Sequence, residues 1–296
     1  MPADQMNARW RDYLGDYWQL MRLDKPIGIW LLLWPTLWGL WLGAGGMPPL
    51  DVLLVFMAGT VLMRSAGCVI NDYADRDFDP HVARTQQRPI AAGRISPRQA
   101  LLLFAGLCAA AFALLLLLRP AVMLWSVPAV LLAASYPFAK RFHGLPQAHL
   151  GLAFAWGIPM GFVALHGEVD WPLCLPLMAA TVCWAIAYDS FYAMVDREDD
   201  LKIGVKSSAI LFGRYDRFWI AVFQVLSLSL LAYVGDLAGL GAIYYGALGV
   251  AALLAGWQQW LAASGSTEAC FRAFLNNHYF GMCVFLGLAL DFLQAA

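Results

Sequence analysis

Nine apolar stretches, each nearly free of charge and long enough to cross a lipid bilayer, dominate this sequence of 296 residues. A transmembrane helix needs about 20 consecutive apolar residues to span the hydrocarbon core. The stretches lie at about residues 26–43, 52–70, 99–118, 122–139, 149–165, 171–194, 218–235, 237–263 and 273–290. They predict an all-α integral membrane protein with about nine transmembrane helices.

The composition agrees with a membrane protein and excludes several other classes. Hydrophobic residues make up 61% of the chain and charged residues 13%, whereas a typical soluble domain has about 25% charged residues. The net charge of −1 provides no basic field for nucleic acid. The six cysteines form no CxxC pair, so buried reduced thiols are expected. We expect no nucleic-acid partner, and no obligate protein partner is evident.

The basic residues predict how the chain sits in the membrane. Nearly all lysines and arginines fall in alternate connections between the apolar stretches. The positive-inside rule then places the amino terminus and the long loops in the cytoplasm, and the carboxyl terminus on the other side of the membrane. We expect this membrane to be a bacterial inner membrane, so that the other side is the periplasm. Residues 1–25 carry an apolar stripe at helical spacing and are expected to form a cytoplasmic interfacial helix before a single transmembrane domain over residues 26–296. A short helix packed under the bundle is the alternative.

Two short stretches, at residues 71–79 and 189–200, hold nine of the 20 acidic residues, and each ends an apolar helix. Side chains four residues apart share a helix face, and like charges at that spacing repel unless a cation neutralises them. Oxygen ligands suit Mg²⁺, which completes its shell with water and substrate phosphates. The pattern predicts Mg²⁺ on a diphosphate, with Asn71, Asp75, Asp79, Asp196 and Asp200 as ligands.

The two acidic stretches also look like copies. Asp75 and Asp79 correspond to Asp196 and Asp200 at one offset of 121 residues. A basic pair follows each, Arg84/Arg88 in one stretch and Lys202/Lys206 in the other. We therefore predict two tandem four-helix repeats, at about residues 26–140 and 148–263, and a ninth helix at about residues 273–290. Sites in such proteins commonly lie between the repeats.

Arg64 is a charge inside the second apolar stretch, about two helical turns deeper than the first acidic residue. Charges at such a depth are costly and usually face the bundle interior. Arg64 is therefore expected to bind an anionic group of a second substrate below the metal site. A structural ion pair with another helix is the alternative interpretation.

The sequence resembles the UbiA-type family of intramembrane aromatic prenyltransferases. NDYADRDFD at residues 71–79 and YDSFYAMVDREDD at residues 188–200 resemble the paired aspartate-rich motifs of that family. Five further segments are similar to the branch that prenylates 4-hydroxybenzoate: RLDKPIG at 22–28, WPTLWGLW at 34–41, SYPFAKR at 135–141, WGIPM at 156–160 and DLKIGVKSSA at 200–209. The resemblance spans roughly residues 20 to 215.

The resemblance implies a helical bundle around a central cavity open to lipid. It implies Mg²⁺-dependent transfer of a polyprenyl group from polyprenyl diphosphate to 4-hydroxybenzoate, ortho to the hydroxyl, in ubiquinone biosynthesis. The expected substrate-binding residues are Arg22, Lys25, Arg64, Asn71, Arg76, Arg84, Arg88, Lys140, Arg141, Lys202 and Lys206. The expected catalytic residues are Asp72, Asp189 and Tyr192. Arg64 or Arg22 would hold the benzoate carboxylate, and Asp189 would polarise the phenol or accept the ring proton.

Two other functions fit parts of the pattern. A sibling prenyltransferase with another aromatic acceptor would need the same acidic stretches. An ion-coupled transporter would also place acids in membrane helices. The acids here cluster at one membrane face, however, and halves of four helices each would be parallel repeats, so the transporter is disfavoured.

Overall fold

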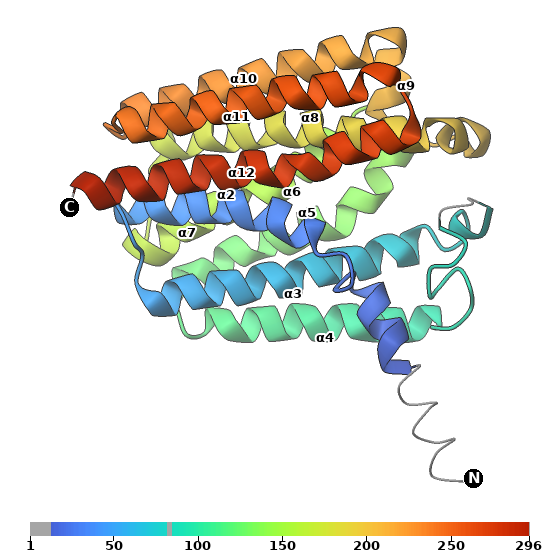
Figure 1. Ribbon diagram of the computed structural model, residues 1–296. Coiled ribbons are helices and arrows are strands. Elements are labelled where there is room, and N and C mark those ends of the chain that lie inside the picture. The colour runs from blue at the N-terminus through green and yellow to red at the C-terminus, as the bar shows by residue number, and fades with distance from the viewer. Residues whose placement is uncertain (1–12, 82–84, 296) are drawn as a thin grey trace.

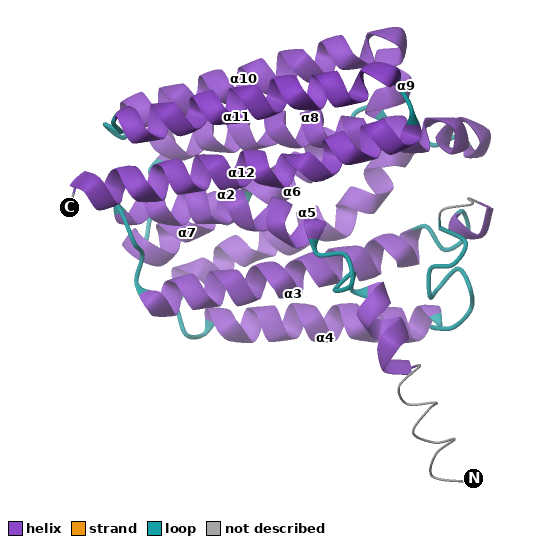
Figure 2. Ribbon diagram, in the orientation of Figure 1, coloured by secondary structure: helices purple, strands orange, loops and turns teal. Residues whose placement is uncertain are grey.

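The computed structural model describes residues 13–81 and 85–295, and within them every regular element is a helix (Figure 2). The α-helices after residues 13–20 are α2 (Ile27–Ala44), α3 (Leu50–Ala74), α4 (Pro97–Leu115), α5 (Ala121–Phe142), α6 (Pro146–Ala155), α7 (Gly157–His166), α8 (Trp171–Ile203), α9 (Ser208–Phe212), α10 (Asp216–Leu237), α11 (Ala242–Leu261) and α12 (Thr267–Ala295). The 3₁₀ turns are η1 (Asp79–His81), η2 (Gly213–Tyr215) and η3 (Ala262–Ser264). The all-α prediction is confirmed.

Eight segments of the described chain are long and apolar enough to cross a membrane, and α6 with α7 counts as one of them. The 20-residue helix α11 is the ninth long helix, but tyrosines and glutamines lower its hydropathy. The glutamines are satisfied inside the protein. Gln224 of α10 donates to Gln258 at 2.9 Å, and Gln258 donates to Asn276 of α12 at 3.1 Å. The described residues thus agree with about nine crossings.

The long helices run roughly side by side, so the connections gather at two ends of the bundle (Figure 1). One end, here called the polar end, holds the start of α2, the segment after α3 and helix α9. The carboxyl-terminal end of α12 lies at the opposite end (Figure 1). An odd number of crossings separates the ends of a chain in this way.

Residues 13–20 form a helix that packs under the bundle at the polar end. Leu20 is buried in a small apolar cluster with Val69 of α3 and with Ile90 and Ile95 of the following segment. The opposite side of the helix leaves Leu14 and Trp18 exposed, among others. The helix therefore combines the packed alternative with an apolar outer face that suits a membrane interface. The prediction for residues 1–12 lies outside the described residues.

The two acidic stretches differ in local structure. Helix α3 ends at Ala74, Asp75 is its C-cap, and Asp79 begins the turn η1. Arg141 helps to end α3, because it donates to the carbonyl of Ala74 at 2.6 Å. Helix α8 instead continues through the second acidic stretch to Ile203. Only the second stretch is thus one continuous helical column, and the tandem repeat stays a prediction.

The fifth apolar stretch is two helices, α6 and α7, that meet at Trp156. Pro159 has no N–H to donate to the carbonyl of Ala155, so the helical ladder is interrupted there. The Trp156 indole donates to the carbonyl of Trp125 on α5 at 2.9 Å. The break places Trp156 and Gly157 against the neighbouring helices of the first half, where they line a cavity.

Candidate active site

A buried cluster of acids and bases lies at the polar end, next to the end of α3. Asp72 is only 1% exposed, and both of its carboxylate oxygens accept from Arg22, at 2.9 and 3.0 Å. Arg88 lies 3.1 Å from Asp72 and donates to Asp79 at 2.9 Å. The two arginines therefore share Asp72, and Arg88 ties the end of α3 to the turn η1.

The backbone of Arg22 is unusual. It is the only non-glycine residue with a positive φ, 57°, in the part of the chain that the structure describes. Left-handed backbone costs a non-glycine residue about 1–2 kcal/mol, and such strain persists where surrounding contacts fix it. Here the guanidinium bonds both Asp72 and the carbonyl of Gln19, at 2.9 Å. The turn after residues 13–20 thus delivers Arg22 to the acidic stretch.

Asp75 is 3% exposed and only half satisfied. Its Oδ2 atom accepts from Lys140 of α5 at 2.5 Å and from Asn71 at 3.3 Å. Its Oδ1 atom is buried and has no hydrogen-bond partner among the described residues. A buried carboxylate oxygen without a partner is costly. This oxygen therefore fits a ligand that brings a positive charge, such as a hard cation.

Burial and charge act in opposite directions on the pKa values of this cluster. Burial raises the pKa of the Asp79 carboxyl, and the nearby Arg88 lowers it, with burial the larger influence. Burial would lower the pKa of Arg88, but Asp72 and Asp79 together outweigh it and raise that pKa. Arg88 therefore stays charged, and its charge opposes the effect of burial on the Asp79 carboxyl.

The acidic residues do not form a ready-made metal centre. Across residues 13–81 and 85–295, no three histidine, cysteine, aspartate or glutamate side chains converge as metal ligands would. Mg²⁺ usually takes only one or two carboxylates and completes its shell with water and substrate phosphates. The oxygen donors and the unsatisfied Asp75 atom therefore fit Mg²⁺ that is bound together with a diphosphate. Asp196 and Asp200 lie in the electrostatic surroundings of Asp189 on α8.

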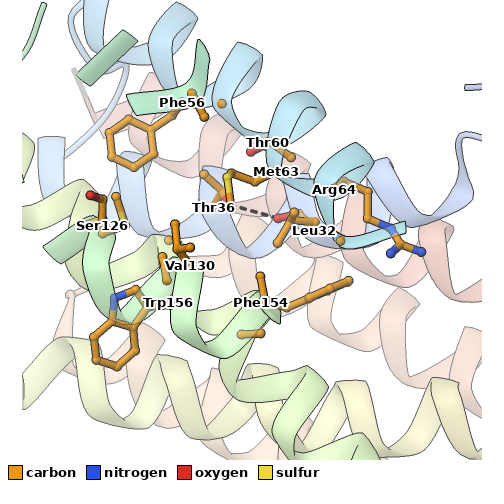
Figure 3. A pocket seen from close by; sticks show the side chains of 18 of the residues that line it. Leu32, Thr36, Phe56, Thr60, Met63, Arg64, Ser126, Val130, Phe154 and Trp156 are labelled. Carbon is orange, nitrogen blue, oxygen red and sulfur yellow. Dashed lines mark hydrogen bonds between the residues drawn. The ribbon is translucent and has the colours of Figure 1, made fainter. Parts of the chain in front are cut away.

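An apolar cavity of about 160 Å³ lies between helices α2 to α7. Figure 3 shows Arg64 at one end of it and Phe56, Ser126 and Trp156 at the other. The Arg64 guanidinium lies 5.9 Å from the ring centre of Phe154. Its Nε atom is buried without a partner within the described residues. The prediction that Arg64 faces the bundle interior is confirmed.

Polar side chains gather around Asp189, close to Arg64. Asp189 lies near enough to Arg64, Tyr136 and Tyr188 to interact with them electrostatically, and Gln147 of α6 is a further neighbour of Asp189. Tyr136 lines the cavity together with Arg64. Tyr136 belongs to the SYPFAKR segment at residues 135–141, but the sequence alone assigned it no role. No pattern in the sequence pointed to Gln147, which becomes visible only when α6 packs on α8.

Comparison with known proteins identifies the family of this chain. The model of the UbiA prenyltransferase family matches residues 32–282. The chain belongs to the UbiA prenyltransferase family. It is 57% identical over 282 residues to a 4-hydroxybenzoate octaprenyltransferase of Azoarcus sp. (strain BH72), covering 95% of this chain and 98% of that protein. It is 58% identical over 279 residues to the protein of the same name from Nitrosococcus oceani, covering 94% and 98%.

Solved structures of UbiA proteins share the fold. A UbiA homologue from Aeropyrum pernix K1 superimposes with a TM-score of 0.79 at 27% identity, covering 89% of this chain and 97% of that one. A UbiA homologue from Archaeoglobus fulgidus, bound to GPP and Mg²⁺, gives a TM-score of 0.67 at 20% identity, covering 93% and 99%. Membership of this family of transferases removes the transporter alternative.

The remaining predicted residues of this UbiA protein fall into different surroundings. Lys206 donates to the carbonyl of Phe142 at 3.0 Å, and Arg141 lies over Phe78 and Phe138, so both side chains hold the polar end together. Arg76 covers the ring of Tyr73, Lys202 pairs with Asp199 at 3.0 Å, and Lys25 is exposed. Tyr192 packs against Phe274 and lies in the electrostatic range of Arg88. Arg84 lies outside the described residues.

Arg88→Met is expected to lower stability as well as activity. The substitution leaves Asp72 and Asp79 buried with fewer positive partners, and breaking a buried ion pair costs about 3–5 kcal/mol. We expect a clear fall in Tm, measured on the detergent-solubilised protein. Arg94→Met is the matched control, because Arg94 pairs with Asp16 at 2.7 Å on an exposed surface. Equal Tm values for the two variants would contradict the structural importance of the buried cluster.

Proposed function

We propose that this protein transfers a polyprenyl group from polyprenyl diphosphate to 4-hydroxybenzoate, at the ring carbon ortho to the hydroxyl, in ubiquinone biosynthesis. The observation that carries the proposal is that α3 joins a buried acid–base cluster at its end to an apolar cavity that Arg64, two turns earlier on the same helix, helps to line. The cluster suits a diphosphate with its metal, and the cavity suits apolar parts of the substrates. The names of the relatives support this acceptor.

In this proposal Asn71, Asp75 and Asp79 from one stretch and Asp196 and Asp200 from α8 hold Mg²⁺. The bound metal supplies positive charge that stabilises the departing diphosphate. Arg22, Arg88 and Lys140, which now pair with acids, neutralise phosphate oxygens when the diphosphate binds. Asp72 acts on the reaction as a positioning residue, because its two oxygens hold Arg22 and Arg88 in place.

The chemistry begins when the bond between the prenyl carbon and the diphosphate oxygen breaks and its electron pair leaves with the diphosphate. The ring carbon next to the hydroxyl then bonds to the allylic carbon, and that ring carbon loses its proton. Asp189 is the proposed acceptor of this proton. The apolar walls of the cavity exclude water, which would otherwise capture the allylic cation. Tyr192 is proposed to contact the diphosphate beside Arg88.

The proposed setting is the bacterial inner membrane, with the polar end in the cytoplasm and the carboxyl terminus in the periplasm. Helices α4 and α5 support a lipid environment, because much of their apolar surface is exposed on the molecule. The basic residues at the polar end support the cytoplasmic assignment of that end.

The proposal is tested by prenyl transfer with purified protein in detergent. The protein receives 4-hydroxybenzoate and a polyprenyl diphosphate, with Mg²⁺ or with a chelator. We expect metal-dependent formation of 3-polyprenyl-4-hydroxybenzoate. Consumption of the diphosphate without this product would favour a sibling prenyltransferase with another aromatic acceptor. Folded protein that consumes no allylic diphosphate at all would overturn the proposal.

A further inference from the structure

We propose that Gln147 accepts a hydrogen bond from the hydroxyl of the aromatic acceptor and is thereby a specificity-determining residue of this site. The inference rests on the proposed function and deepens it. Gln147 is 4% exposed, and no described residue partners its Oε1 atom. An acceptor atom this deeply buried requires a donor.

The packing of α6 on α8 places Gln147 opposite Asp189. A Cβ added to Gly151 of α6 would lie 2.8 Å from the Cα atom of Val182 and 3.0 Å from the Cβ atom of Ala185 on α8. The two helices therefore touch at backbone distance. Gln147 lies four residues before Gly151, and Asp189 lies four residues after Ala185. The two helices are antiparallel, so one turn back along α6 and one turn forward along α8 lead to the same level of the bundle. Gln147 and Asp189 are therefore brought together.

The amide of Gln147 offers one hydrogen-bond donor group, Nε2, and one acceptor, Oε1. A carboxylate accepts hydrogen bonds, so in our proposal the Nε2 donor of the amide is the group that faces Asp189. The buried and unpartnered Oε1 atom then remains as the acceptor for a substrate hydroxyl. Gln147 also shares its helix face with Leu150 and Phe154, which line the cavity. The free acceptor thus belongs to the α6 face that lines the cavity, about one turn nearer the start of the helix than Leu150.

Two other unsatisfied polar atoms lie in the same surroundings. Within residues 13–81 and 85–295, neither Nε of Arg64 nor the hydroxyl of Tyr188 has a hydrogen-bond partner, and Tyr188 is 1% exposed. Both side chains lie in the electrostatic range of Asp189. Arg64 offers a donor for an anion, and Gln147 offers an acceptor for a hydroxyl. The complementary ligand is an aromatic acid that also carries a hydroxyl group.

The proposed contact would also help the reaction. When Gln147 accepts a hydrogen bond from the phenol, electron density on the oxygen rises and the ortho carbon becomes a better nucleophile. The phenol keeps its proton throughout, and the proton lost from the ring carbon passes to Asp189. The amide therefore selects the acceptor and orients its reactive carbon without a change in its own charge.

The test compares 4-hydroxybenzoate with benzoate, which lacks the hydroxyl, in the wild-type protein and in Gln147→Met. Methionine keeps the volume of glutamine but removes both hydrogen-bonding atoms. We expect the KM for 4-hydroxybenzoate to rise about 10- to 100-fold, the effect of losing one buried hydrogen bond. The inhibition constant of benzoate and the KM for the polyprenyl diphosphate should stay unchanged. A parallel loss for both aromatic acids would overturn the inference.

Gln258→Met is the matched control, because Gln258 is a buried amide in α11 far along the chain from this site. It should lower Tm and leave the discrimination between the two aromatic acids intact. Gln147→Asn, which only shortens the side chain, provides a milder second variant with an intermediate rise in KM. An active wild-type protein whose Gln147 variants keep full discrimination would overturn this inference alone. An inactive wild-type protein would overturn the proposed function and this inference with it.

Discussion

Asp75→Ala is expected to reduce prenyl transfer by about a hundred- to a thousandfold, the range seen when a charge-stabilising group is removed from an active site. The carboxylate accepts from Lys140 and Asn71 through one oxygen, and the other oxygen has no partner among the described residues. Its loss removes a proposed metal ligand and leaves the Lys140 ammonium without its carboxylate. The measurement is product formation at saturating concentrations of both substrates and of Mg²⁺.

Asp77→Ala is the matched control for this prediction. Asp77 lies two residues further along the same acidic stretch, but its side chain is 74% exposed and lies 3.6 Å from Arg76. Exposed ion pairs contribute about 1 kcal/mol or less, so this variant should keep nearly full activity and Tm. Similar losses in both variants would mean that charge in the segment matters and that the position of Asp75 does not.

The sequence predicted those features that depend on single segments. Hydropathy located the long helices, because each crossing needs its own run of apolar residues. The depth of Arg64 in such a run indicated an inward-facing charge, and the structure places that side chain at the cavity. The acidic stretches were visible from composition and spacing alone.

Features that arise from contacts between segments could not be predicted in the same way. Arg141 and Lys140 are adjacent in the sequence, yet Lys140 binds Asp75 and Arg141 bonds the carbonyl that ends α3. Spacing could not distinguish them, because the difference depends on how α5 packs beside α3. The spacing of Asp75 and Asp79 alone likewise favoured one helical column through both residues. Helix α3 instead ends at Ala74, so both residues lie beyond the helix.

Arg64→Met should raise the KM for 4-hydroxybenzoate by at least about 100-fold while the KM for the polyprenyl diphosphate changes little. The reason is that hydrogen bonds from a charged donor to a carboxylate are worth about 1.5–3 kcal/mol each, and a guanidinium can make two of them. Benzoate, as a competitive inhibitor, should lose affinity to the same extent, because it retains the carboxylate. This parallel loss distinguishes Arg64 from Gln147, for which only the hydroxylated acid should be affected. Equal effects on both substrates would contradict a specific contact with the acceptor.

A second variant moves the Arg64 guanidinium without deleting it. Gly28 on α2 lies against this group, and an added Cβ would lie 2.2 Å from Nε and 2.4 Å from one terminal nitrogen. Because alanine is a better helix former than glycine, Gly28→Ala should leave α2 intact and displace the flexible arginine. We expect a smaller rise in the KM for 4-hydroxybenzoate, about 10-fold for the loss of one hydrogen bond. Gly106→Ala on α4, where an added Cβ meets nothing within 4 Å, should leave that KM unchanged. Comparing the KM values of Gly106→Ala, Gly28→Ala and Arg64→Met thus separates the effect of moving the guanidinium from the effect of removing its charge.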